Sequence, residues 1–144
     1  MQTNPKISVL MGVYNAENDL KNSIESILNQ TYEDFEFIIV NDGSTDNSRE
    51  VIEVYAQKDK RIHLVNQENT GLTKALNNGI SLSKGKYIAR QDADDISYPD
   101  RFQKQIDLMA SNEAVVLTGG NCDDLYADGS TGEWGAYAQE ELQK

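Results

Sequence analysis

The sequence predicts an α/β fold in which helices cover both faces of a doubly wound, mainly parallel sheet. Short apolar runs alternate five times with stretches whose apolar residues have helical spacing. The runs are nearly continuous, which is typical of strands buried on both faces. Turn signals rich in Asn, Asp and Gly follow several of them. In such sheets ligands bind outside the carboxyl ends of the strands, so the residues at those ends are the candidate functional residues.

The first half of the chain contains two strand–helix units. Residues 7–13 (ISVLMGV) form the first expected strand and residues 35–40 (FEFIIV) the second, which stops at the turn signal NDGS. A helix capped by Asn18 or Glu17 is expected between them, with the apolar residues Leu20, Ile24, Ile27 and Leu28. A second helix follows the turn, with the expected inner residues Val51, Ile52, Val54 and Tyr55.

The second half continues the alternation. Residues 62–65 and 87–89 are the third and fourth expected strands, and the helix between them opens at Thr70 and Gly71. The next helix has Pro99 in its first turn, where proline is favoured. Residues 114–117 (AVVL) are the expected fifth strand.

Composition and charge exclude several classes of protein. The chain has 144 residues, with 24 acidic and 13 basic side chains and a formal net charge of -11. This acidity disfavours a nucleic-acid partner, which needs clustered Lys and Arg. No apolar run approaches the roughly 20 residues of a membrane span, and no basic and apolar leader opens the chain, so a cytoplasmic location is expected. Cys122 is the single cysteine, which excludes an internal disulfide and a multi-cysteine zinc site.

An acidic cluster follows the fourth expected strand. If the backbone of residues 92–95 (DADD) stays extended, Asp92 and Asp94 point to the same side. Two like charges so close repel each other unless a cation is shared between them. Oxygen ligands without a nearby His or Cys suit Mg²⁺ or Mn²⁺. We interpret the cluster as a metal and phosphate site; a solvated acidic turn is the alternative.

Three other polar residues have both a functional and a structural interpretation. Asp42 is a candidate ligand, but Asp is also a common turn residue. Glu17 follows the first strand, but it is also a favourable acid in the first turn of a helix. Lys74 adds positive potential beside the helix N-terminus at Thr70 and Gly71, or it is an ordinary solvated lysine.

Four segments of the chain together resemble a known family. They are ISVLMGVYNAE, SILNQTYEDFEFIIVNDGSTDNS, ENTGLTKALNNGISLSKGKYIARQDADD and SYPDRF. In this order they resemble the N-terminal half of the family 2 inverting glycosyltransferases, over about residues 6–120. The resemblance implies a Rossmann-like GT-A fold, with residues 1–120 as the nucleotide-sugar-binding half-domain and residues 121–144 as the start of a truncated acceptor-side region.

The resemblance also implies roles for individual residues. The segment VYNAE, including Val13, Tyr14, Asn15 and Glu17, would line the base and ribose pocket, and Asp42 would accept a hydrogen bond from the base. Asp92, Ala93 and Asp94 would form an Asp-x-Asp motif. Asp92 would lean toward the ribose, and Asp94 would coordinate the Mn²⁺ or Mg²⁺ ion that bridges the two donor phosphates.

The family pattern and this chain differ in three places within the donor half. Gly12 stands where proline is common, and Asn41 stands where the first aspartate of Asp-Asp-Gly-Ser is usual. Lys74 lies in the segment that faces the donor pocket, but Leu76 stands where arginine is frequent. The first two changes are mild and leave the expected donor site intact.

The implied reaction is transfer of a sugar from a nucleotide diphosphate sugar, UDP-linked in our expectation, to a glycan or lipid-linked acceptor with inversion. The full-length enzyme is expected to act in polysaccharide biosynthesis. Peripheral association of that enzyme with the inner face of the membrane is compatible with this expectation. The general base is unassigned, because the acids after residue 120 follow no acceptor-side pattern; they are Asp123, Asp124, Asp128, Glu133, Glu140 and Glu141. A nucleotide-sugar and metal-binding module without transferase activity is the alternative. A phosphoacceptor signalling domain is disfavoured, because its paired acids would follow the first strand.

Overall fold

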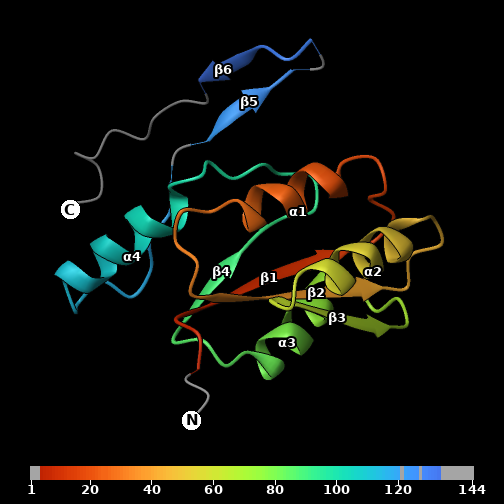
Figure 1. The fold of residues 1–144 in the computed structure, drawn as a ribbon, viewed down its shortest axis with the longest axis horizontal. Coiled ribbons are helices and arrows are strands. Elements are labelled where there is room, and N and C mark those ends of the chain that lie inside the picture. The colour runs from red at the N-terminus through yellow and green to blue at the C-terminus, as the bar shows by residue number, and fades with distance from the viewer. Residues whose placement is uncertain (1–3, 121, 127, 134–144) are drawn as a thin grey trace. The chain divides into compact units, whose positions relative to one another are not determined.

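Four parallel strands form the central sheet. The computed structural model describes residues 4–120, 122–126 and 128–133. The strands β1 (Ile7–Val13), β2 (Phe35–Asp42), β3 (Ile62–Gln67) and β4 (Tyr87–Arg90) lie in the order β3-β2-β1-β4. The helices α1 (Leu20–Leu28), α2 (Ser48–Lys58) and α3 (Leu72–Leu82) join consecutive strands, with α1 and α2 on one face of the sheet and α3 on the other (Figure 1). This arrangement confirms the predicted α/β class.

The core lies on both faces of β1 and β2. Every residue of β2 is buried, because the strand has a neighbour on each side and helices above and below it. Leu10, Ile38 and Val40 pack with Ala75 of α3. The residues that alternate with them, including Met11 and Phe37, are fully buried on the opposite face.

The predicted helical faces are mostly correct, and Val54 is the exception. Leu20, Ile24 and Ile27 of α1 are completely buried, as their spacing predicts. In α2 only Ile52 among the predicted inner residues is fully buried, whereas Val54 is 47% exposed. Two positions along an α-helix turn the side chain by about 200°, so Val54 lies on the far side from Ile52.

The prediction of a fifth sheet strand at residues 114–117 is wrong. This segment forms no strand, and Val116 and Leu117 are 87% and 85% exposed. A four-residue apolar run has too little pattern to identify a strand by itself. Two short antiparallel strands follow it, β5 (Asp123–Leu125) and β6 (Thr131–Glu133). Gly129 in their connection has a positive φ of 82°, and an Asp-Gly pair such as residues 128 and 129 is typical of hairpin turns.

The chain divides into two compact units, residues 1–103 and 104–144. The parallel sheet and α1 to α3 belong to the first unit, and the β5–β6 hairpin belongs to the second. The helix α4 (Arg101–Ser111) begins in the first unit and continues into the second. No helix among the described residues has the length and apolar character needed to cross a membrane.

A buried carboxylate organises the amino-terminal edge of the sheet. Glu36 in β2 accepts a hydrogen bond of 2.6 Å from the Ser8 hydroxyl and one of 2.7 Å from the backbone N–H of Lys84. The Gly85 N–H donates to the Ser8 hydroxyl over 2.8 Å. The imidazole of His63, the only histidine of the chain, lies 3.8 Å from Glu36. These contacts attach the α3–β4 loop to β1 and β2.

This close approach predicts that residue 85 tolerates only glycine. A Cβ atom on Gly85 would lie 2.4 Å from the backbone nitrogen of Ser8, so Gly85→Ala forces the loop away from β1. We expect a loss of about 1–3 kcal/mol in the free energy of unfolding, measured by urea denaturation. Gly119→Ala is the control, because a Cβ there meets nothing within 4 Å. Equal stability of the two variants would contradict the crowding at Gly85.

Candidate functional site

A cleft of about 400 Å³ opens at the carboxyl ends of β1 and β4. It is bounded by the loop after β1, the loop after β4 and the first residue of α3. Its lining residues are Gly12, Tyr14, Asn15, Ala16, Asp19, Leu72, Asp92, Ala93 and Asp94. Five of the predicted site residues therefore meet in one cleft, although they come from two segments almost 80 residues apart; they are Tyr14, Asn15, Asp92, Ala93 and Asp94.

The other four predicted residues do not line this cleft. Val13 is 1% exposed and belongs to the core. Glu17 faces the start of α2, where its carboxylate accepts hydrogen bonds from the backbone N–H of Asn47 at 2.9 Å and from its side-chain amide at 2.8 Å. Lys74 lies on the exposed surface of α3, and Asp42 is buried beneath the N-terminus of that helix.

Sequence reasoning missed Asp19 and Leu72. Asp19 is the N-cap of α1, in place of the expected Asn18 or Glu17, but its side chain makes no capping hydrogen bond. An Asp directly before the first apolar residue of a helix was an available signal. Leu72 is 49% exposed at the cleft wall, and a Cβ on Gly12 would lie 2.7 Å from its Cδ1 atom. Only the fold reveals that contact.

The Asp42 carboxylate accepts hydrogen bonds from the backbone N–H groups at the start of α3. Its Oδ1 atom accepts hydrogen bonds from the Gln67 amide at 2.7 Å and from the Thr70 N–H at 2.9 Å, and its Oδ2 atom accepts one from the Gly71 N–H at 2.8 Å. Burial, the largest single influence, raises the pKa of this carboxyl. The hydrogen bonds from Thr70, Gln67 and Gly71 together outweigh burial, so the pKa of Asp42 is below its ordinary value.

The loops after β1 and β2 are joined by Asn15. This residue has a φ of 52°, in the left-handed region that Asn tolerates better than most residues. Its side-chain oxygen accepts a hydrogen bond of 2.8 Å from the Thr45 N–H, and its own N–H donates to the Ser44 hydroxyl over 3.1 Å. The loop that forms one wall of the cleft is thus attached to the loop between β2 and α2.

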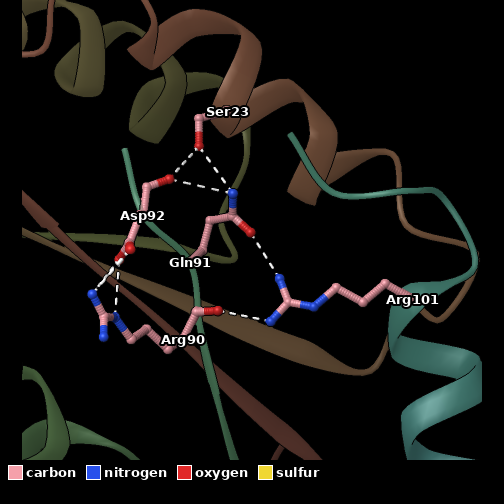
Figure 2. A network of polar contacts seen from close by, with 5 residues as sticks. All are labelled: Ser23, Arg90, Gln91, Asp92 and Arg101. Carbon is pink, nitrogen blue, oxygen red and sulfur yellow. Dashed lines mark hydrogen bonds and ion pairs between the residues drawn. The ribbon is translucent and has the colours of Figure 1, made fainter. Parts of the chain in front are cut away.

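The acidic cluster lies on a turn, and the expectation of an extended backbone through residues 92–95 is wrong. The Asp95 N–H donates to the Asp92 carbonyl over 3.3 Å, which closes a turn. The buried Gln91 amide donates to the carbonyls of Asp92 at 3.3 Å and Asp95 at 2.8 Å. Ser23 of α1 also donates to the Asp92 carbonyl, over 2.9 Å (Figure 2). Side chains therefore take the place of sheet hydrogen bonds in this loop.

Arg101 completes the support of the acidic turn. Its guanidinium donates to the side-chain oxygen of Gln91 and to the Ser97 hydroxyl, each over 2.8 Å, and to the Arg90 carbonyl over 2.7 Å. Figure 2 shows the Gln91 side chain between Ser23 and Arg101. Burial lowers the pKa of Arg101, against the opposing charge of Asp95. Arg101 thus orders the backbone on both sides of Gln91.

The two cluster carboxylates differ in their surroundings. Asp92 forms a bidentate ion pair with Arg90, with 2.9 Å from Nε to Oδ1 and 2.9 Å from Nη2 to Oδ2. Asp94 is exposed and lines the cleft. Partial desolvation, followed by the charges of Asp92 and Asp94, raises the pKa of Asp95. Negative charge is therefore concentrated at this end of the cleft.

The donor set suits a metal ion that takes most of its ligands from a substrate. Among the described residues, no group of three or more His, Cys, Asp or Glu side chains is arranged to hold a metal ion. Mg²⁺ in proteins commonly uses one or two carboxylates together with substrate phosphates and water, and Mn²⁺ accepts similar oxygen ligands. Asp92 and Asp94 at the cleft fit such a site.

Comparison with known proteins identifies similar sequences and folds. Residues 8–133 match the family model described as Glycosyl transferase family 2. The chain is 42% identical over 121 residues to the putative glycosyltransferase EpsE of Bacillus subtilis, with 83% of this chain and 44% of EpsE covered. It also resembles the S. aureus TarS structure in complex with UDP, with a TM-score of 0.70 and 23% identity over 75% of this chain and 33% of that one. The mannosyltransferase PcManGT of Pyrobaculum calidifontis, in complex with GDP-Man and Mn²⁺, has a TM-score of 0.69 at 23% identity, with the same coverage.

The hydrogen bonds that Asp42 accepts should stabilise the fold in a pH-dependent way. In Asp42→Asn an amide NH₂ group replaces one acceptor oxygen, so at least one backbone N–H of residues 70 and 71 loses its partner. We expect a loss of about 1–3 kcal/mol in the free energy of unfolding at pH 7. The folded-state pKa is below the ordinary value of 3.8, so this contribution is complete above that value and is lost as pH falls through the folded pKa.

Urea denaturation between pH 7 and pH 2.5 measures this effect. The difference in stability between the parent and Asp42→Asn should shrink at the acid end of that range. The exposed Asp34 supplies the control variant Asp34→Asn, which should match the parent at pH 7. A difference that grows on acidification would contradict the assigned role of Asp42.

Proposed function

Because the chain belongs to glycosyl transferase family 2, we propose that it is the donor-binding part of an enzyme that transfers a sugar from a nucleotide diphosphate sugar to a glycan or lipid-linked acceptor with inversion. Its fold is of the GT-A type. One observation carries the proposal: Tyr14, Asn15, Asp92 and Asp94 meet in a cleft at the carboxyl ends of β1 and β4. The chain spans 44% of EpsE and about a third of the two similar structures, so the acceptor side is proposed for the longer enzyme.

The two ends of the cleft suit the two ends of a nucleotide diphosphate. Tyr14 and Leu72 are 53% and 49% exposed, and both line the cleft, which provides apolar surface for a base or ribose. The acidic turn lies in the same cleft and repels a diphosphate unless a cation intervenes. We infer that the nucleoside contacts the residues that follow β1, and that the diphosphate contacts the residues that follow β4. UDP is the proposed nucleotide, in line with the UDP complex of TarS.

Mn²⁺ or Mg²⁺ is the proposed cofactor. Asp94 and Asp92 would hold it, and the bound ion would neutralise the charge that develops on the leaving diphosphate. The Mn²⁺ complex of PcManGT supports this choice. Asp94 is the better placed ligand, because its exposed carboxylate has no ion pair among those observed in the described residues, whereas Asp92 is paired with Arg90.

The remaining predicted residues contribute in different ways. A carboxylate offers about four lone-pair positions. Asp42 is 3% exposed and lies outside the cleft lining, and in the described part of the chain its Oδ2 atom accepts only the Gly71 N–H. On the family resemblance we propose that this oxygen also accepts a base N–H. Glu17 positions the loop after β1 through Asn47, and Val13 supports that loop from the core. Lys74 supplies positive potential from the surface of α3.

The general base is unassigned. Asp123, Asp124 and Asp128 are exposed on the β5–β6 hairpin and its connection, and Glu140 and Glu141 lie outside the described residues. An inverting displacement requires a base on the face opposite the leaving diphosphate, so Asp94 cannot serve both as metal ligand and as base. For the longer enzyme we propose a role in polysaccharide biosynthesis at the cytoplasmic face of the membrane.

Calorimetric titration with UDP tests the donor site. We expect the parent chain to bind UDP in the presence of Mn²⁺ and to bind it at least tenfold more weakly when Mn²⁺ is removed with a chelator. Asp94→Asn should lose most of the benefit of Mn²⁺, because it removes the exposed carboxylate ligand. The control Asp34→Asn removes an equal charge from an exposed position and should bind as the parent does.

Two outcomes would count against this proposal. UDP affinity that is equal with and without Mn²⁺ would exclude the metal bridge, and the absence of UDP binding in either condition would exclude the donor site. An assay of sugar release or transfer then separates an enzyme from a binding module. We expect little turnover from the 144-residue chain, because transfer needs a general base to deprotonate the acceptor and we identify none in this sequence.

A further inference from the structure

The ion pair between Arg90 and Asp92 occupies a carboxylate of the proposed metal site. Arg90 is the last residue of β4, and Asp92 follows two positions later, at the start of the acidic turn. The guanidinium meets the carboxylate through two parallel hydrogen bonds, each of 2.9 Å. Figure 2 shows the Asp92 carboxylate directed at Arg90, away from Gln91 and Arg101. Both oxygens of Asp92 are therefore engaged by a cation that belongs to the protein.

The backbone on either side of this pair is fixed, but the pair itself is accessible. The Arg90 carbonyl accepts a hydrogen bond from Arg101, and the Asp92 carbonyl accepts one from Ser23. The side chains of Arg90 and Asp92 are 57% and 42% exposed. Bidentate geometry strengthens the pair, but at this exposure water screens it and the long arginine side chain loses freedom in it, so the pair costs little to separate. The guanidinium can therefore leave Asp92 without any change in the backbone.

We propose that Arg90 is an internal counter-cation that occupies Asp92 until a divalent metal ion replaces it. The inference rests on the proposed function, since it concerns the same metal site. Without a cation, the carboxylates of Asp92, Asp94 and Asp95 repel one another on a single turn, and the guanidinium relieves this repulsion. A metal ion that binds Asp92 competes with the guanidinium, because two cations that share one carboxylate repel each other. Arg90 therefore lowers the affinity of the empty cleft for free metal.

Direct Mn²⁺ binding to Arg90→Gln tests this competition. Free Mn²⁺ is followed by electron paramagnetic resonance during titration of the parent and the variant, without nucleotide. We expect Arg90→Gln to bind Mn²⁺ about two- to fivefold more tightly, the range that corresponds to an exposed ion pair. Glutamine retains a polar side chain but carries no charge, so it cannot neutralise Asp92. Circular dichroism should show the same fold, since the side chain is exposed.

Arg49→Gln is the matched control. Arg49 is an exposed arginine with its own carboxylate partner, Glu53 at 2.8 Å, and it lies on α2, outside the cleft lining. It should bind Mn²⁺ as the parent does. Equal or weaker binding by Arg90→Gln would overturn the inference, and so would an equal gain in Arg49→Gln, which would indicate a general effect of net charge. If no protein binds Mn²⁺, the inference also fails.

The UDP titration separates this failure from a failure of the proposed function. If the parent binds UDP with Mn²⁺ dependence while Arg90→Gln and the parent have the same Mn²⁺ affinity, only the role of Arg90 is wrong. If the parent binds neither Mn²⁺ nor UDP, the donor site itself is wrong. Tighter Mn²⁺ binding confined to Arg90→Gln supports the counter-cation.

Discussion

The parallel pairing of β1 with β2 and with β4 is the constraint on which the rest of the structure depends. β1 pairs along its full length with β2, and Ile7 to Leu10 pair with β4. Because the strands are parallel, their carboxyl ends lie at one edge of the sheet. Residues 14–16 and 92–94 become neighbours there only for this reason. The cleft is a direct consequence of strand direction.

The same constraint leaves backbone groups in the loops after the strands without sheet hydrogen bonds, and polar side chains supply the missing partners. A parallel strand ends abruptly, and the loop that follows has backbone groups without sheet partners. Buried side chains satisfy them: Asp42 at the start of α3, and Gln91 and Ser23 at the acidic turn. Among the described residues, no buried side-chain nitrogen or oxygen lacks a hydrogen-bond partner. The loops of the cleft are thus attached to the core by polar contacts, and the acidic turn is held by hydrogen bonds from Ser23 and Gln91.

Local patterns predicted the parts of the fold that depend on local physics. The runs ISVLMGV and FEFIIV are buried on both faces, and such burial requires continuous apolar sequence. The run at residues 114–117 has similar composition, but it pairs with no strand among the described residues, and Val116 and Leu117 are exposed. Whether an apolar run becomes a strand depends on a partner elsewhere in the chain, and four residues do not reveal that partner.

Within the candidate site, residue type was predictable and contacts were not. The sequence places Asp92 and Asp94 after a strand, and both line the cleft. The capping of Thr70 and Gly71 by Asp42 connects positions almost 30 residues apart, so no local pattern contains it. The contact of Glu17 with Asn47 is equally absent from any local pattern, since Asn47 belongs to another loop. The parallel pairing of β2 with β3 brings Asp42 to residues 70 and 71, and the pairing of β1 with β2 brings Glu17 to Asn47.

The contact between Gly12 and Leu72 has an evolutionary consequence. With glycine at position 12, Leu72 occupies the space in which a Cβ atom would otherwise lie. Any larger residue at position 12 pushes that leucine side chain out of its place in the cleft wall. Mutations at these two sites are therefore epistatic, and we expect them to covary among descendants of a common ancestor. A lineage that exchanges glycine for proline here inherits a differently shaped wall, and selection then acts on residue 72 to restore or to use the new shape.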